Sequence, residues 1–369
     1  MRRRDMHVVD LHCDTIMQLW FAELRGEPLP FDNTAGTGHE LMLDLAKMKA
    51  GDYLLQNFAM FVDLHRPADF DGIRFDPTFM KGHEVQKEPR YMNPWKQTEE
   101  MLRVFRKTMA EHQDVIGQVF TWQDIENNRR DGKMSALLTV EEGGVLEGDL
   151  SRLETLYEAG VRMMTITWNY DNELGHPNTP PEGYEEDFSR YFRFSPRRDN
   201  GLTDLGKEAV YRMGQMGMLP DVSHLSDAGF FDVADVVGGP FVASHSNARA
   251  IAGGNRNMTD EMIRTVAEHG GIIGLNYCPA FVMEASRAED CYMTCEGLAR
   301  HARHIMNVGG REVLALGSDF DGIAPMNLEM KDASEIQKLA SFLEHAGFTA
   351  EEIEGIYWKN ALRLYRETF

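Results

Sequence analysis

Eight short apolar segments, most of them followed by a longer amphipathic stretch, constrain the fold of this chain more than any other sequence feature. The predicted strands are residues 7–11, 53–62, 134–140, 161–167, 218–222, 241–243, 271–276 and 313–316. The predicted helices include residues 204–216, 227–237, 259–269, 296–308 and 333–346. Strands that alternate with helices are typical of parallel β–α units, and eight such units close into a barrel. We therefore expect an α/β protein built as a (β/α)8 barrel of the TIM type.

A length of 369 residues fits one such barrel, so residues 1–369 are expected to form a single domain. Two stretches interrupt the alternation, at about 65–94 and 171–200, and both are rich in proline and charged residues. Segments of this length without regular structure are usually functional loops of a compact domain. We therefore expect two elaborated loops on one barrel.

The charge balance excludes partners with dense negative charge. The chain has 38 Lys and Arg against 59 Asp and Glu, a formal net charge of −21. Phosphate backbones and anionic bilayers would be repelled, so we expect neither a nucleic-acid nor a membrane partner. No apolar run approaches the length of a membrane span, and no apolar stretch follows the basic N-terminus as in a signal peptide. Four cysteines are few for a secreted protein stapled by disulfides, so a cytoplasmic location is expected.

Two polar motifs stand where predicted strands end. His12 and Asp14 lie in the motif DLHCD after the first strand, and side chains two positions apart on a strand share a face. An imidazole and a carboxylate placed in this way can bind a divalent metal. Glu141 leaves a buried strand in the motif VEEGG, and the two oxygens of a carboxylate can each serve one cation. Glu142 is the competing candidate for this bridging role.

Three further candidates follow later strands. His224 lies in DVSHLS and His245 in SHSNAR, 21 residues or one β–α unit apart, and Asp319 lies in GSDFDG after the last strand. The catalytic face of a barrel is built at the carboxyl ends of its strands, so these side chains should converge there. Imidazoles with carboxylates suit two divalent cations, with zinc as the first candidate and manganese or cobalt as alternatives.

These motifs, taken in this order, resemble the membrane dipeptidase family, also called renal dipeptidases, which are zinc metallopeptidases. The resemblance extends over almost the whole chain, from Val9 to about Tyr357. It implies a dipeptide substrate and favours a homodimer.

The resemblance also implies a role for each metal ligand. His12 and Asp14 correspond to the ligands of one zinc ion, and His224 and His245 to those of the other. Glu141 corresponds to the carboxylate that bridges them, because the register of the segments after it favours Glu141 over Glu142.

Three residues are assigned to substrate and catalysis by the same resemblance. Arg256 matches the arginine that binds the substrate carboxylate, with Arg249 as an alternative that we expect to be structural. Asp319 matches the aspartate that carries a proton and faces the substrate. The chain departs from the mammalian members at Trp168, where they have a substrate-contacting histidine; the indole N–H could still polarise an oxygen.

We therefore expect a binuclear zinc-dependent dipeptidase in which a hydroxide shared by both metals attacks the scissile carbonyl. Another metal-dependent amidohydrolase or a lactonase on the same barrel is the alternative within enzymes, although those barrels more often begin with H-x-H than with H-x-D. A catalytically silent metal-binding barrel is the alternative outside them. Two other histidines, His301 and His304, are expected on a solvated helix face rather than at a metal.

Overall fold

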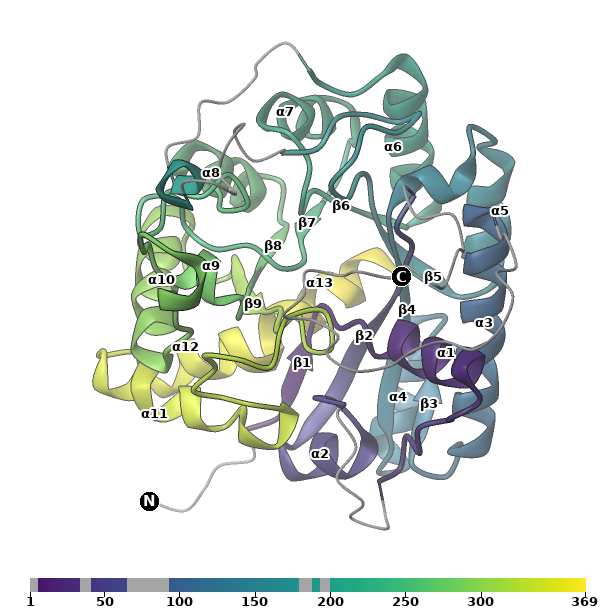
Figure 1. Cartoon of the computed structure of the whole chain (residues 1–369), viewed down its shortest axis with the longest axis horizontal. Helices are drawn as coiled ribbons and strands as arrows, with labels where there is room; N and C mark the ends of the chain where they lie inside the picture. Colours follow the sequence, from purple (N-terminus) through teal and green to yellow (C-terminus); the bar gives the residue numbers. More distant parts are fainter. Residues whose placement is uncertain (1–5, 34–40, 65–92, 179–187, 193–199) are drawn as a thin grey trace.

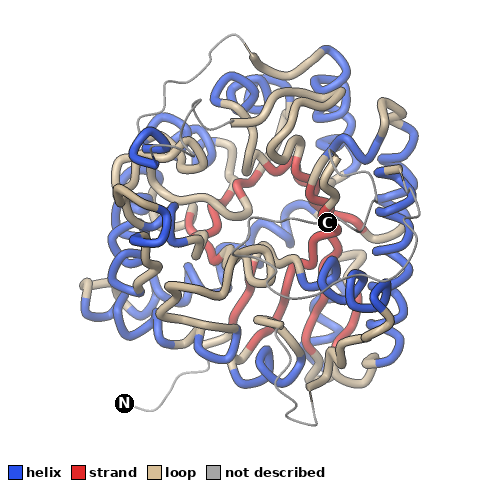
Figure 2. The backbone as a smooth tube through the Cα atoms, viewed as in Figure 1, coloured by secondary structure: helices blue, strands red, loops and turns tan. Residues whose placement is uncertain are grey.

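Parallel strands form a closed ring at the centre of the molecule, and helices surround it (Figure 2). The computed structural model describes residues 6–33, 41–64, 93–178, 188–192 and 200–369. The strands are β1 (Val8–Asp10), β2 (Tyr53–Phe61), β3 (Ile116–Gln118), β4 (Met134–Glu141), β5 (Val161–Thr165), β6 (Leu219–Asp221), β7 (Val242–Ala243), β8 (Ile272–Leu275) and β9 (Leu314–Leu316). The predicted (β/α)8 barrel is confirmed, because eight of these strands are hydrogen-bonded in a ring in which β2 pairs with both β1 and β4.

The strand β3 lies outside the ring and was not predicted. It pairs in parallel with the first residues of β4, from Met134 to Ala136, before β5 takes over as the neighbour of β4 at Leu138. It therefore extends the sheet without taking part in closure.

The helices follow the strands around the ring (Figure 1). They are α1 (Thr15–Arg25), α2 (Leu45–Ala50), α3 (Pro94–Glu111), α4 (Trp122–Arg130), α5 (Ser151–Glu158), α6 (Asp204–Met216), α7 (Asp227–Val236), α8 (Asp260–Glu268), α9 (Pro279–Val282), α10 (Cys295–Gly309), α11 (Lys338–His345), α12 (Ala350–Glu354) and α13 (Asn360–Thr368). Shorter helical turns are η2 (Gly143–Leu146), η3 (Phe188–Phe192), η4 (Ala288–Asp290), η5 (Ala333–Glu335) and the π-helical η6 (Gly355–Lys359). The helix predicted at 333–346 is thus divided into η5 and α11.

Local sequence explains where several of these helices begin. Thr203, Ser226 and Thr259 each precede a helix, and each side chain accepts a hydrogen bond from the backbone N–H three residues later. This contact satisfies one of the N–H groups that have no partner within the helix itself. None of the helices in the described part of the chain is long and apolar enough to cross a bilayer.

Two apolar clusters stabilise the barrel. The larger lies between strands and surrounding helices. The smaller contains side chains from the strands, among them Val9, Leu137 and Ile272, together with Leu364 and Tyr365 of α13. The hydroxyl of Tyr365 donates a hydrogen bond of 2.9 Å to Oδ1 of Asn57 on β2. Helix α13, visible behind the ring in Figure 1, therefore packs against the strands and closes one end of the barrel.

The two predicted loops are described to different extents. Of the stretch 65–94, residues 65–92 lie outside the described residues. Of the stretch 171–200, residues 171–178 and 188–192 and Asn200 are described, and 188–192 form η3.

Candidate active site

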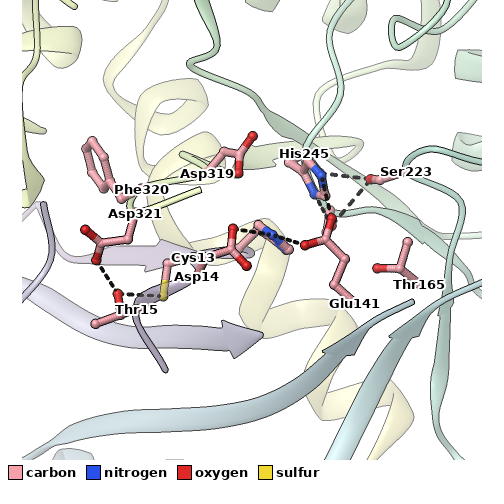
Figure 3. A network of polar contacts seen from close by, with 12 residues as sticks. Cys13, Asp14, Thr15, Glu141, Thr165, Ser223, His245, Asp319, Phe320 and Asp321 are labelled. Carbon is pink, nitrogen blue, oxygen red and sulfur yellow. Dashed lines mark hydrogen bonds and ion pairs between the residues drawn. The ribbon is translucent and has the colours of Figure 1, made fainter. Parts of the chain in front are cut away.

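The carboxylate of Glu141, the last residue of β4, lies among three buried histidine side chains. Its Oε2 is 3.4 Å from Nε2 of His12, and its Oε1 is 3.2 Å from Nε2 of His224 and 3.5 Å from Nε2 of His245. These histidines follow β1, β6 and β7, and Figure 3 shows Glu141 pointing toward His245. The structure thus brings four of the predicted metal ligands together at the carboxyl ends of the strands.

Hydrogen bonds define which nitrogen of His245 carries its proton. Nδ1 is 2.7 Å from Oγ of Ser244, and that hydroxyl donates its only proton to Oδ2 of Asp221 over 2.5 Å. The hydroxyl oxygen of Ser244 must therefore accept a hydrogen bond from the Nδ1–H group of His245, which leaves a lone pair on Nε2. Thr165 also donates to Asp221, so β5, β6 and β7 are joined beneath this histidine.

His224 is oriented in the same sense by a different partner. Its Nδ1 lies 3.0 Å from the side-chain oxygen of Asn169, so Nδ1 donates and Nε2 is again the acceptor. The Nε2 atoms of His224 and His245 are 3.0 Å apart, and both face Glu141. Two neutral imidazoles thus direct their lone pairs at one point.

Asp14, the remaining predicted ligand, lies beside His12 together with Asp319. Oδ2 of Asp14 is 3.5 Å from Nε2 of His12, and His12, Asp14 and Asp319 can offer ligand atoms within 4.8 Å of one another. His12, Glu141 and His245 form a second group that meets the same limit. The amide of Asn276 donates to Oδ2 of Asp319 over 3.0 Å and fixes this carboxylate against β8.

The charges of these groups are mutually dependent. Burial raises the pKa of Glu141 to about 7, and the nearby Asp14 adds to this shift. Burial, again with Asp14 and Glu141, raises the pKa of Asp319 to about 7. Burial opposes protonation of His12, but the attraction of Glu141 and Asp14 outweighs it and holds the pKa of His12 well above its ordinary value. The cluster therefore favours added positive charge.

These residues fit divalent cations. Nε2 of His12 and Oδ1 of Asp14 are buried, and neither has a hydrogen-bond partner among the described residues. Burial, together with the charges of Arg256 and His12, lowers the pKa values of His224 and His245 well below the ordinary value, so both are neutral and able to ligate. A cation at this point would satisfy the unpartnered atoms and reverse the repulsion among the carboxylates.

The competing candidate for the bridge, Glu142, faces away from this cluster. Its carboxylate accepts hydrogen bonds from the backbone N–H of Gly144 and of Trp168 and from the side chain of Asn172, at 2.7, 2.8 and 2.5 Å. Glu142 thus holds the segment after β5 in place, and Glu141 is the residue that faces the histidines.

A cavity of about 690 Å³ opens above the cluster, and the three predicted substrate contacts, Arg256, Trp168 and Asp319, all line it. Arg256 is buried beside Phe281, and its guanidinium donates to the carbonyl of His245. Trp168 lies on the opposite side, with its ring centre 6.1 Å from that of His224. Arg249 does not line the cavity, because Asp227 binds its guanidinium at two points, at 2.7 and 2.8 Å.

Unusual backbone positions lie at this site. His224 and Asp319 have φ angles of 70° and 63°. Residues other than glycine rarely adopt this left-handed backbone conformation, and it often marks functional positions. Gly322 leaves room for the carboxylates, since a Cβ there would lie 2.0 Å from Oδ2 of Asp14 and 2.4 Å from Oδ1 of Asp319.

Sequence reasoning did not assign the residues that orient the histidines. Asp221 lies in the motif DVSHLS and Ser244 in SHSNAR. An aspartate at the end of the short strand β6 could have been recognised from the sequence as a polar residue that interrupts an apolar run. Asn169 and Asn276 had no such signal, because their roles depend on which strands are neighbours.

Comparison with known proteins agrees with the family resemblance of the motifs. The sequence model of the membrane dipeptidase family (peptidase family M19) matches residues 3–368. An uncharacterized protein from the pqqA 5′ region of Klebsiella pneumoniae is 29% identical over 271 residues, which cover 73% of this chain and 95% of that protein. An uncharacterized dipeptidase of Schizosaccharomyces pombe is 29% identical over 333 residues, 88% of this chain and 72% of that protein.

The barrel also matches a solved structure. A metallopeptidase from Rhodobacter sphaeroides, liganded with a phosphinate mimic of the dipeptide L-Ala-D-Ala, aligns with a TM-score of 0.79 at 24% identity. The alignment covers 98% of this chain and 99% of that one.

Proposed function

Since the chain belongs to the membrane dipeptidase family, peptidase family M19, and is a metal-dependent dipeptidase, we propose that it works with two zinc ions. The proposed ligands are His12, Asp14, Glu141, His224 and His245, with Glu141 shared between the ions. The observation that carries this proposal is the convergence of three imidazole Nε2 atoms on the two oxygens of Glu141, within 3.2–3.5 Å. Nitrogen and carboxylate oxygen ligands are those that zinc prefers at catalytic sites.

The ions would supply a water activated as nucleophile and a Lewis acid that polarises the scissile carbonyl. Asp319 would then accept the proton that this water releases and pass it to the nitrogen of the leaving amine. Asn276 keeps this carboxylate turned toward the cluster.

Arg256 would bind the free carboxylate at the end of the dipeptide. The guanidinium is buried, lines the cavity and donates a hydrogen bond to the backbone carbonyl of His245. A substrate carboxylate paired with it would therefore place the peptide bond over the cluster. Such a charge-assisted pair in a partly dry cavity is stronger than a surface ion pair. Trp168 would contact the other part of the substrate, and the ligand of the Rhodobacter sphaeroides relative supports a dipeptide in this cavity.

We also propose that the protein is a single-domain, cytoplasmic homodimer. The low cysteine content and the family resemblance support this, and sedimentation of the purified chain tests its oligomeric state.

The decisive experiment compares a dipeptide with its C-terminal amide. Metal analysis of the purified protein should find two ions per chain, and the wild type should cleave the dipeptide far better than the amide. Arg256→Ala should keep both ions but lose on the order of a hundredfold in kcat/KM, because a carboxylate left unpaired in the cavity costs a few kcal/mol. Arg256→Lys should recover only part, because an ammonium lacks the planar fork of the guanidinium.

Three outcomes would contradict the proposal. One ion per chain would remove the binuclear centre. Equal cleavage of dipeptide and amide by the wild type would remove the role of Arg256. Faster hydrolysis of lactones or N-acyl amino acids than of any dipeptide would point to another substrate class.

A further inference from the structure

Asp10, the last residue of β1, is a fully buried carboxylate that the proposed reaction does not use. Its Oδ1 accepts hydrogen bonds from two backbone N–H groups, that of His12 at 3.3 Å and that of Ser318 at 2.9 Å. His12 is a proposed metal ligand, and Ser318 directly precedes Asp319, the proposed proton carrier. One oxygen of Asp10 therefore joins the two segments that hold these groups.

The two segments lie side by side beyond the ends of β1 and β9. The N–H of Asp319 donates to the carbonyl of His12 over 3.2 Å, and the N–H of Asp14 donates to the carbonyl of Phe320 over 3.0 Å. Asp319 also has a left-handed backbone, which the surrounding structure must hold in place. Buried N–H groups without an acceptor are unfavourable, so removal of the Asp10 carboxylate would displace both segments.

The same arrangement recurs at the other pair of proposed ligands. Oδ1 of Asp221, the last residue of β6, accepts the N–H groups of Ser223 and Ser244 at 3.0 and 2.9 Å. These serines directly precede His224 and His245. In both places a buried aspartate at the end of a strand accepts one N–H two residues later and another just after the neighbouring strand. This recurrence, with one aspartate beside each proposed ion, indicates a common role.

We propose that Asp10 is a positioning residue for the ion held by His12 and Asp14, and that it acts through the backbone of His12 and Ser318. Asp221 has the corresponding role for the other ion. The inference rests on the proposed function, because it concerns the ions that those ligands hold. Each aspartate should therefore affect mainly the ion beside it.

The second oxygens of the two aspartates have different surroundings. Oδ2 of Asp221 accepts the hydroxyl groups of Thr165 and Ser244 at 2.8 and 2.5 Å. Oδ2 of Asp10 is buried and has no hydrogen-bond partner among the described residues. An amide nitrogen can therefore replace Oδ2 of Asp10 while Oδ1 remains the acceptor, so Asp10→Asn should keep the positioning role.

Asp221→Asn should not be tolerated in the same way. An amide nitrogen in the place of Oδ2 would donate to the oxygen of Ser244, whose hydroxyl proton would then turn to Nδ1 of His245. The imidazole proton would move to Nε2, and the lone pair that binds the ion would be lost. The opposite orientation of the amide would turn its nitrogen toward two N–H donors.

The test titrates the metal-free protein with zinc and follows two binding events by calorimetry. NMR signals of the imidazoles assign the events, because one ion shifts His12 and the other shifts His224 and His245. Asp10→Ala should weaken the ion at His12 by about ten- to a hundredfold with little effect on the other ion, and Asp10→Asn should restore most of the affinity. Asp221→Asn should instead weaken the ion at His224 and His245.

Asp44→Ala is the matched control for the loss of a buried aspartate. Asp44 is fully buried, and its Oδ1 accepts the backbone N–H of Lys47 at the start of α2. Denaturant unfolding of each variant should show that Asp44→Ala is destabilised, whereas zinc titration should show both affinities unchanged. Asp10→Ser, whose shorter side chain cannot reach both N–H groups, replaces Asp10→Ala if that variant does not fold.

Three results would overturn the inference. The first is an Asp10→Ala variant with wild-type affinity for both ions, and the second is an equal loss at both ions, which would indicate a general structural role. The third is an Asp10→Asn variant that loses as much affinity as Asp10→Ala, which would show that the charge of Asp10 matters rather than its acceptor. A wild-type protein that binds fewer than two ions would instead contradict the proposed function itself.

Discussion

Two adjacent carboxylates at the end of β4 face opposite surroundings, because successive side chains of a strand point to opposite sides. Glu141 turns to the three histidines, whereas Glu142 turns to the segment that carries Trp168. Glu142 also has a φ of 103°, so the strand ends at this residue. The same side-chain chemistry therefore serves a proposed metal bridge at one position and a structural anchor at the next.

Glu141→Gln should remove one or both ions and nearly all activity, because a neutral amide bridges two cations poorly. Glu142→Gln should retain the ions but lower the free energy of unfolding by about 1–3 kcal/mol, because its amide nitrogen would face a backbone N–H donor. Metal analysis and denaturant unfolding of both variants measure this contrast. The reverse pattern would show that Glu142 is the bridge.

A second prediction at the residue scale concerns Gly322. The carboxylates of Asp14 and Asp319 occupy the space that a Cβ would need, so Gly322→Ala should displace one of them and weaken metal binding at least tenfold. Gly239→Ala is the control, since a Cβ there meets no atom within 4 Å and neither glycine has a left-handed backbone. Metal titration of both variants is the measurement, and equal affinities would refute the steric argument.

The polar residues at strand ends could be predicted from sequence because they interrupt apolar runs, as His12 and Glu141 do. The partners that orient them could not. Asn169 lies in a loop and contacts His224 only because β5 and β6 are neighbours in the ring. Asn276 likewise contacts Asp319 only because β8 and β9 are neighbours in the ring.

At the scale of elements, helix α10 shows how tertiary packing overrides a local pattern. His301 was expected on a solvated face, and this is wrong: its side chain is fully buried. Nδ1 accepts the N–H of Ala248 at 3.1 Å and Nε2 lies 3.0 Å from the carbonyl of Val282. The neutral imidazole thus joins α10 to the segment after β7 and to α9, which no helical periodicity could indicate.

This contact predicts a pH dependence of stability. Burial lowers the pKa of His301 to about 4, from 6.5 in the unfolded chain, so the unfolded state binds more protons between these values. The stabilisation is fully present above pH 6.5 and is lost as the pH falls through 4. Between pH 7 and pH 5 the wild type should lose about 2 kcal/mol of unfolding free energy relative to His301→Gln.

Denaturant unfolding of both proteins at the two pH values, under the same metal conditions, gives this difference. The carboxylates of the cluster are common to both proteins and cancel. A difference that does not change with pH would show that His301 does not titrate in this range.

Element boundaries also depend on pairing. β3 has only three residues, with a glycine at its centre, and becomes a strand because it lies against Met134–Ala136 of β4. The eight strands of the ring were predictable because each is a longer or more apolar run bounded by helical pattern. Their closure through β2 and β4 was predicted only as a fold class, since no local signal specifies that pairing.

At the scale of the whole molecule, the proposed ligands tie together β1, β4, β6 and β7. Bound ions should therefore stabilise the entire barrel, by about 2.7 kcal/mol for each ion when free zinc is a hundred times its dissociation constant. Chelation should lower the melting temperature, and added zinc should restore it. The Glu141→Gln variant should respond much less; an equal response would place the stabilising ions elsewhere.

The pairing of β1 with β9 also sets the order of events as the chain folds. Residues 11–313 separate these two strands, so the ring cannot close until the two ends of the barrel sequence meet. Contacts between distant parts of a chain form slowly, because the entropy of closing the loop is lost before the contact repays it. The rings of His12 and His245, which follow β1 and β7, stack at 4.0 Å between their centres, and this contact across the barrel requires the closed ring. Zinc uptake during refolding should therefore report the late step of assembly, after the individual β–α units have formed.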